Sequence, residues 1–273
     1  MRSGRPGRGL RRVAIAMCVL LCGASFQGAA THAAPDSGES GPLVGRSCLP
    51  PVSASPVTQA KLGVVGRKLQ KLMPIRILAI GSSSTEGIGA SSAGRAYPAR
   101  LEAALRTRWP REPLSVVNAG VSGEKVAATV DRLEHQLATQ RYDLVIWQLG
   151  TNDAVGGDDP EAFRPLVERG VAAAPTAGVD LVMLDPQYFP GISDPARYER
   201  FVEVIRRVGE ASHVPVFRRY AMMKRWNAQG EADLLAALSP DHFHMNDQGY
   251  ACLAEGLTTE IAHMAEQPTV ATQ

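Results

Sequence analysis

Four short segments of this 273-residue chain contain the side chains with which proteins perform acyl transfer. They are residues 81–87 (Gly-Ser-Ser-Ser-Thr-Glu-Gly), 118–123 (Asn-Ala-Gly-Val-Ser-Gly), 150–153 (Gly-Thr-Asn-Asp) and 241–246 (Asp-His-Phe-His-Met-Asn). A serine hydroxyl is a weak nucleophile near neutral pH and needs an adjacent base to remove its proton. An imidazole titrates close to working pH and can be that base. The residue types therefore predict nucleophilic catalysis by serine.

The last segment also offers a carboxylate to orient the base. Asp241 precedes His244 by three residues, so a helical or turn-like backbone brings the carboxylate towards the imidazole ring. There it can fix the tautomer of the ring and stabilise the imidazolium. By residue type alone, each serine of residues 82–84 can attack, and His242 is a second candidate for the base.

The elements that must position these segments alternate along the chain. Nearly continuous apolar runs, typical of parallel strands covered on both faces, predict five strands, at 75–81, 114–118, 143–149, 179–184 and 214–218. Helical patterns lie between and after them, at about 96–108, 125–140, 160–174, 195–210 and 247–265. This alternation predicts an α/β fold, a doubly wound, mostly parallel five-stranded sheet with helices on both faces.

The fold class predicts where a site should lie. In doubly wound sheets, ligands bind beyond the carboxyl ends of the strands. Three of the four segments directly follow predicted strands or form their ends, and the fourth directly precedes the last predicted helix. All four are therefore expected at one edge of the sheet.

In this order and spacing, the four segments resemble the conserved blocks of the SGNH (GDSL-type) hydrolase family, over roughly residues 75–256. The first is similar to its Gly-Asp-Ser-hydrophobic-Thr-Glu-Gly block, and the match of Thr85-Glu86-Gly87 puts Ser83 in the nucleophile position. The last is similar to its Asp-x-x-His block, which implies His244 as the base and Asp241 as its orienting carboxylate. The flavodoxin-like fold of that family agrees with the strand and helix pattern.

The resemblance also implies an oxyanion hole. Gly123 matches the glycine whose N–H helps to form it, and Asn152 matches the asparagine that supplies a side-chain donor. The N–H of Ser83 would be the third donor. The family's usual aspartate before the nucleophile is Ser82 here, which leaves open how the nucleophile loop is anchored. Met245 likewise stands where the family often has proline.

The first 33 residues have the pattern of a secretory signal peptide. Five arginines and no acidic residue are combined with an apolar run at 13–24 and small residues thereafter. The run is shorter than the roughly 20 residues that span a bilayer, so no stable membrane insertion is expected after cleavage. Residues 34–58, rich in Pro, Ser and Gly, predict an arm or linker, and residues 59–273 a single SGNH hydrolase domain. The expected location is secreted or periplasmic.

Composition excludes some functions. After the leader, 27 acidic side chains face 24 basic ones, which argues against a nucleic-acid partner. The sequence has no His-Glu-x-x-His, paired Cys-x-x-Cys or Gly-Lys-Ser/Thr phosphate motif, so neither metal nor cofactor is expected. Cys48 and Cys252 are the two cysteines outside the leader, and in an exported protein they predict a disulfide, with two separate thiols as the alternative.

Together these features predict a serine esterase that forms an acyl-serine intermediate. Export and the family resemblance suggest small acyl groups, such as acetyl, on an extracellular saccharide or glycoside. Gln187 and Tyr188, after the fourth strand, and His242 are candidates for substrate contacts. Two alternatives remain open: an acyltransferase that uses the same triad, and a catalytically inactive carbohydrate-binding module.

Overall fold

The computed structural model describes Cys48 and residues 61–267. The expected leader (1–33) and, apart from Cys48, the expected arm (34–58) lie outside the described residues. None of the helices in the described part of the chain is long and apolar enough to cross a membrane.

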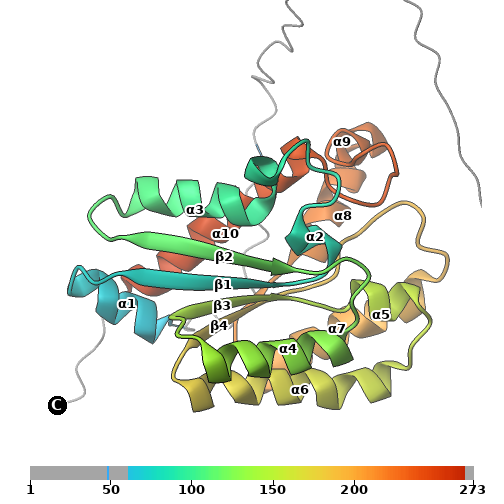
Figure 1. Ribbon diagram of the computed structural model, residues 1–273. Coiled ribbons are helices and arrows are strands. Elements are labelled where there is room, and N and C mark those ends of the chain that lie inside the picture. The colour runs from blue at the N-terminus through green and yellow to red at the C-terminus, as the bar shows by residue number, and fades with distance from the viewer. Residues whose placement is uncertain (1–47, 49–60, 268–273) are drawn as a thin grey trace, which may run out of the picture. The chain divides into compact units, whose positions relative to one another are not determined.

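Five parallel strands form one sheet (Figure 1). They are β1 (Ile75–Gly81), β2 (Leu114–Gly120), β3 (Leu144–Gln148), β4 (Asp180–Leu184) and β5 (Val216–Phe217), in the order β2-β1-β3-β4-β5. The strand order reverses at β1, so that β2 and β3 lie on either side of it. The predicted α/β fold with a doubly wound parallel sheet is confirmed.

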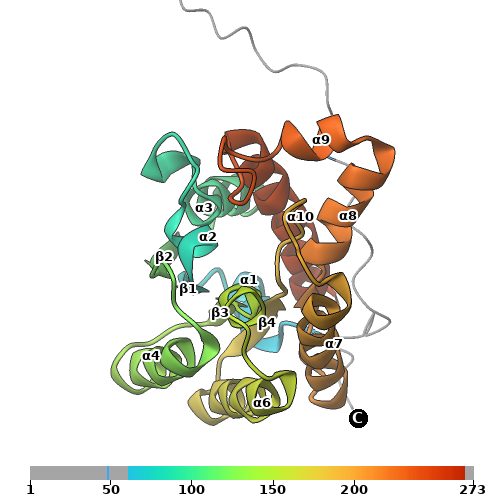
Figure 2. The same cartoon turned by 90° about the vertical axis from the view of Figure 1, so that its right-hand side faces the viewer.

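Helices cover both faces of the sheet, and Figure 2 shows the two layers end-on. One face is covered by α1 (Gly63–Gln70), α3 (Tyr97–Arg108), α8 (Arg219–Gln229) and α10 (Asp247–Glu266). The other is covered by α4 (Val126–Thr139), α6 (Pro160–Ala177) and α7 (Pro195–Ala211). Three shorter helices follow β1, β3 and α8, respectively: α2 (Ser83–Glu86), α5 (Thr151–Val155) and α9 (Glu231–Leu235). The 3₁₀ turn η1 (Ala93–Arg95) precedes α3.

Alternate residues of each central strand supply the two cores. Ile77 and Ala79 pack into the core beneath α3 and α10, whereas Leu78 and Ile80 pack into the core beneath α4 and α6. All four side chains are fully buried. Burial on both faces explains why the strands read as continuous apolar runs.

Three regions differ from the sequence prediction. The fifth strand pairs only over Val216–Phe217, because Pro215 has no backbone N–H and the strand lies at the sheet edge. Helices α1 and α8 were not predicted. Helix α8 has its apolar and basic residues scattered around its circumference, so the sequence there shows no amphipathic period.

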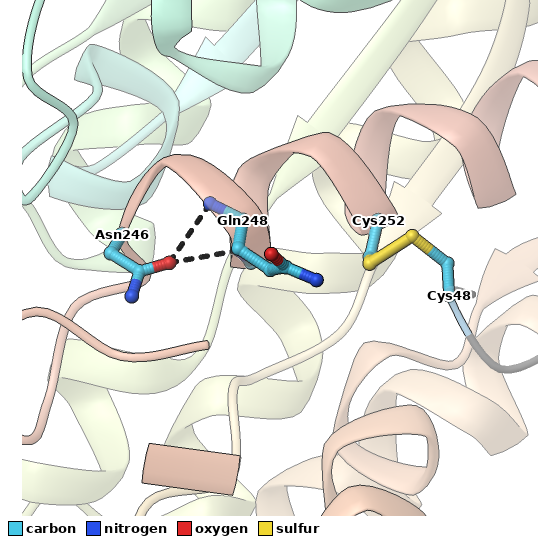
Figure 3. Close-up of a disulfide and its surroundings, with 5 residues drawn as sticks. Cys48, Asn246, Gln248 and Cys252 are labelled. Atoms are coloured by element: carbon cyan, nitrogen blue, oxygen red, sulfur yellow. Dashed lines mark hydrogen bonds between the residues drawn. A yellow bond between two sulfur atoms is a disulfide. The ribbon is translucent and has the colours of Figure 1, made fainter. Parts of the chain in front are cut away.

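Helix α10 begins directly after the fourth of the four segments, residues 241–246, and is anchored at two points (Figure 3). Asn246 caps the helix, because its Oδ1 accepts hydrogen bonds from the backbone N–H groups of Gln248 and Gly249. Six residues after the cap, Cys252 forms a disulfide with Cys48, with Cα atoms 5.2 Å apart. The predicted pair of cysteines is thus joined, and the bond ties a residue of the expected arm to the helix that follows His244.

Candidate active site

The first segment turns the chain sharply at the end of β1. The strand ends at Gly81, and Ser83 begins the four-residue helix α2, which stops at Gly87 in the left-handed region (φ 106°). Residue 120, at the end of β2, is in close contact with α2, because a Cβ atom at Gly120 would lie 2.0 Å from the Glu86 nitrogen. Side chains larger than hydrogen are therefore excluded there, and the first two segments meet at the carboxyl ends of β1 and β2.

Ser83, His244 and Asp241 form a continuous hydrogen-bonded chain. The Ser83 hydroxyl lies 2.9 Å from His244 Nε2, and His244 Nδ1 lies 2.6 Å from Asp241 Oδ2. With the Nδ1 proton donated to the carboxylate, Nε2 has a free lone pair to accept the serine proton. His242 is exposed on the same loop in a left-handed conformation (φ 55°), and His244 is the histidine that faces Ser83.

Asp241 is held as a carboxylate. Its Oδ1 accepts hydrogen bonds from Ser239 Oγ (2.6 Å) and from the backbone N–H groups of Phe243 and His244 (both 2.9 Å). Partial burial alone would raise the pKa of Asp241, but these bonds and the one from the His244 ring outweigh it and hold the pKa well below its ordinary value. The group is therefore charged at neutral pH and suited to orient the ring.

Three consecutive serines point to three different partners. Ser82 Oγ donates to Gln148 Oε1 (3.0 Å), Ser83 Oγ contacts His244, and Ser84 Oγ donates to Gln187 Oε1 (2.9 Å). Only Ser83 of the three contacts the imidazole. The geometry thereby distinguishes the three serines, which by residue type alone were equivalent candidates for the nucleophile.

Gln148 anchors the nucleophile loop at Ser82, the residue directly before Ser83. Its Oε1 accepts from the Ser82 backbone N–H (2.8 Å), the Ser82 hydroxyl (3.0 Å) and the Thr85 hydroxyl (3.3 Å). Gln148 is 1% exposed and Ser82 4% exposed, so these bonds form away from water. A side chain from β3 thus holds the nucleophile loop by three hydrogen bonds.

The three candidate oxyanion donors follow three neighbouring strands, β1, β2 and β3. Gly123 has φ 76°, with no atom within 4 Å of the place a Cβ would occupy, so its backbone borders open space. Asn152 Nδ2 donates to the Glu124 carbonyl (2.8 Å), which leaves its second N–H for another acceptor. Within residues 61–267, the N–H groups of Ser83 and Gly123 donate to no protein acceptor.

The candidate substrate residues lie in different environments. Gln187 is fully buried: its Oε1 accepts from Ser84, and its Nε2 donates to the Phe243 carbonyl (2.9 Å). It therefore bridges the nucleophile turn and the histidine loop rather than facing an open surface. Tyr188 is half-buried and packs edge-on against Tyr220.

Sequence reasoning missed two polar residues that organise the site. No role was predicted for Gln148, although a single amide at the end of an otherwise apolar strand is a signal for a buried hydrogen-bonding role. Nor was a role predicted for Glu86, whose carboxylate accepts from the Ser122 N–H (2.7 Å) and hydroxyl. In the part of the chain that the structure describes, no cluster of three or more His, Cys, Asp or Glu residues could hold a metal ion.

Comparisons with known proteins agree with this fold. The model of the non-GDSL lipase-like family matches residues 47–267. An arylesterase of Vibrio mimicus is 24% identical over 153 residues, which cover 55% of this chain and 74% of that protein.

Solved structures of esterases and lipases share the architecture. A two-domain esterase active on acetylated mannans superposes with a TM-score of 0.64 at 17% identity over 80% of this chain, which spans 57% of that protein's length. A lipase/acylhydrolase from Enterococcus faecalis gives a TM-score of 0.60 at 22% identity, covering 72% of this chain and all of that one. Given the family match over most of its length, the chain belongs to the non-GDSL lipase-like family of SGNH-type hydrolases.

Proposed function

We propose that this protein is a carboxylic ester hydrolase in which Ser83 is the nucleophile. The observation that carries the proposal is the chain of contacts from Ser83 Oγ through His244 to Asp241, at 2.9 and 2.6 Å. An inactive binding module has no need of this alignment. The family match and the arylesterase relative support the same class of reaction.

In the acylation step, Ser83 Oγ attacks the carbonyl carbon of the ester while its proton passes to His244 Nε2. Asp241 stabilises the imidazolium without taking a proton. The negative charge that develops on the carbonyl oxygen is met by the N–H groups of Ser83 and Gly123 and by the Asn152 amide. When the bond to the alcohol oxygen breaks, the alcohol leaves with the proton from Nε2, and the acyl group remains on Ser83.

Deacylation repeats these roles with water. His244 removes a proton from a water molecule, whose oxygen attacks the acyl carbon, and the same three donors hold the second oxyanion. Collapse of this intermediate breaks the bond to Ser83 Oγ, which regains its proton from Nε2. The products are a carboxylic acid and a free enzyme.

The substrate we propose is a small acyl ester, such as an acetyl group, on a saccharide. The two-domain esterase of similar fold, which acts on acetylated mannans, makes acetylated saccharides the first class to test. The test is the kcat/KM of purified protein on p-nitrophenyl esters from acetate to octanoate, followed by acetate release from acetylated oligosaccharides. A maximum at octanoate would contradict the small-acyl proposal, and acetyl transfer to an added sugar acceptor would reveal a transferase.

We further propose that the protein is exported. Support comes from the arginine-rich and apolar start of the chain and from the Cys48–Cys252 disulfide, because such bonds persist in oxidising compartments. Fractionation of cells that express the full chain tests this: the processed protein is expected outside the cytoplasm, and an unprocessed cytoplasmic protein would contradict it.

A further inference from the structure

Of the three proposed oxyanion donors, Gly123 is the one that has no side chain to fix the direction of its N–H. It lies in the loop of residues 121–125 between β2 and α4, which we call the oxyanion loop. Gly123 has no side chain, its conformation is left-handed, and the space beside its Cα is open. The direction of its N–H must therefore be set by the residues on either side, Ser122 and Glu124.

Ser122, on one side, is fixed by the nucleophile segment. The carboxylate of Glu86 accepts from both the backbone N–H and the hydroxyl of Ser122. The preceding residue is also held, since the Val121 N–H donates to the Gly81 carbonyl at the end of β1 (3.0 Å).

Glu124, on the other side, is held by Arg132, which reaches back from α4. Arg132 Nε lies 2.8 and 3.0 Å from the two carboxylate oxygens of Glu124, and Nη2 lies 2.5 Å from Oε2. The two side chains are 30% and 11% exposed, so solvent screens this pair less than a pair on the open surface. A planar guanidinium is suited to such a fork-like contact.

The same guanidinium also reaches the ends of two strands. Arg132 Nη1 donates to the Ala119 carbonyl (2.9 Å) near the end of β2, and Nη2 donates to the Gly81 carbonyl (3.2 Å), two residues before Ser83. Glu124 is in turn linked to the third proposed donor, because its backbone carbonyl accepts from Asn152 Nδ2 (2.8 Å). One side chain thus connects the nucleophile strand, the oxyanion loop and the strand that leads into it.

We propose that Arg132 is a positioning residue of the active site, which sets the direction of the Gly123 N–H through Glu124 and the two strand-end carbonyls. This inference rests on the proposed esterase function. The alternative is that the ion pair of Arg132 and Glu124 is purely structural. The protein contains another pair of similar geometry that can act as a control. Arg169 on α6 makes a similar forked contact with Glu134 on α4, at 2.7 and 2.5 Å. Among the described residues, the ion pairs of Arg169 are with Asp131 and Glu134, both on α4, and none is with a site loop.

The test compares kcat and KM on p-nitrophenyl acetate for Arg132→Lys, Arg132→Gln and the control Arg169→Gln, together with their urea unfolding. Lysine keeps the charge but cannot make the forked contact and both carbonyl contacts at once. Removal of a whole oxyanion donor costs about 10²- to 10³-fold in kcat, so a misdirected donor should cost about 10- to 100-fold. KM should change by less than about threefold, because the Gly123 N–H acts mainly on the transition state. The Arg169 variant should stay within about twofold in both constants.

A second comparison uses Glu124→Gln, alone and combined with Arg132→Lys. If Arg132 acts through Glu124, the double variant should lose no more activity than the more impaired single variant. Independent, multiplying losses would overturn the inference, as would folded Arg132 variants with kcat within twofold of wild type. If Arg132→Gln does not fold, Arg132→Lys and Glu124→Gln decide the matter by the same criteria. Wild type and Ser83→Ala are measured alongside. Equal turnover by these two refutes the proposed function with Ser83 as nucleophile, whereas an intact, Ser83-dependent rate in the Arg132 variants refutes only the positioning role.

Discussion

Replacing Gln148 by methionine should weaken both the fold and the nucleophile turn. The substitution keeps an unbranched side chain of similar size but removes the oxygen that accepts from the Ser82 N–H, the Ser82 hydroxyl and the Thr85 hydroxyl. The two hydroxyls can rotate, and Thr85 keeps a partner in Tyr97 OH (3.1 Å). The Ser82 N–H is fixed by the backbone and would be buried without an acceptor.

The magnitude follows from that difference. A buried donor without a partner costs about 1–3 kcal/mol, and the weakened hydroxyl contacts add about 1 kcal/mol, so the free energy of unfolding should fall by about 2–4 kcal/mol. The matched control is Ser82→Ala, which removes one hydroxyl but leaves the N–H bonded to Gln148. It should cost about 0.5–1.5 kcal/mol. The difference between the variants gives the contribution of the Ser82 N–H together with the smaller one of the Thr85 hydroxyl.

The assay is urea unfolding followed by circular dichroism, with kcat on p-nitrophenyl acetate measured on the same preparations. An unchanged m-value shows that the change lies in stability and not in the extent of unfolding. We expect kcat of Gln148→Met to fall about tenfold or more, because Ser83 directly follows the released residue and small misplacements of a reacting group are costly. Equal unfolding free energies for Gln148→Met and Ser82→Ala would refute the anchoring role.

Three further outcomes are expected. Asn152→Ala should lower kcat about 100-fold, less than the complete loss in Ser83→Ala, because two backbone donors remain; equal losses in a steady-state assay would contradict this. Burial above all raises the pKa of Glu260 to about 8. The folded state therefore keeps a proton that the unfolded state releases, and the free energy of unfolding falls as the pH rises from about 4.5 to 8. Glu260→Gln removes this pH dependence. In urea unfolding, the free energy of unfolding of the variant should therefore rise by at least about 1 kcal/mol relative to that of wild type between pH 5 and pH 8, and a difference that stays constant with pH would contradict this. Replacing Cys48 and Cys252 together by Ala should cost up to about 5 kcal/mol, since the bond spans a sequence separation of 204 residues, and an unchanged melting temperature would argue against its role.

Local patterns were enough to predict the fold and the position of the site. Each central strand is buried on both faces and therefore has an apolar run that is readable in the sequence, and the rule for doubly wound sheets put the four segments at one edge. Two of the failures lie where regularity is weak. The edge strand β5 is limited by Pro215, and α8 has no amphipathic period to reveal it.

The supports of the site could not be predicted, because they join residues far apart in the chain. Gln148 meets Ser82 across 66 positions, and Arg132 meets Gly81 across 51. Both side chains lie in regular elements where a packing or surface role explains the residue type equally well. Only the paired strands and the crossing of α4 over the sheet bring them to the loops that they hold.

The most direct test of the central claim is to label the protein with a fluorophosphonate and locate the adduct by peptide mass spectrometry. An activated serine displaces fluoride and keeps the phosphonyl group, so one adduct per chain is expected, on Ser83. Ser83→Ala should remain unlabelled, and His244→Ala should react far more slowly because the hydroxyl loses its base. An adduct on Ser82 or Ser84, or undiminished labelling of His244→Ala, would contradict the account.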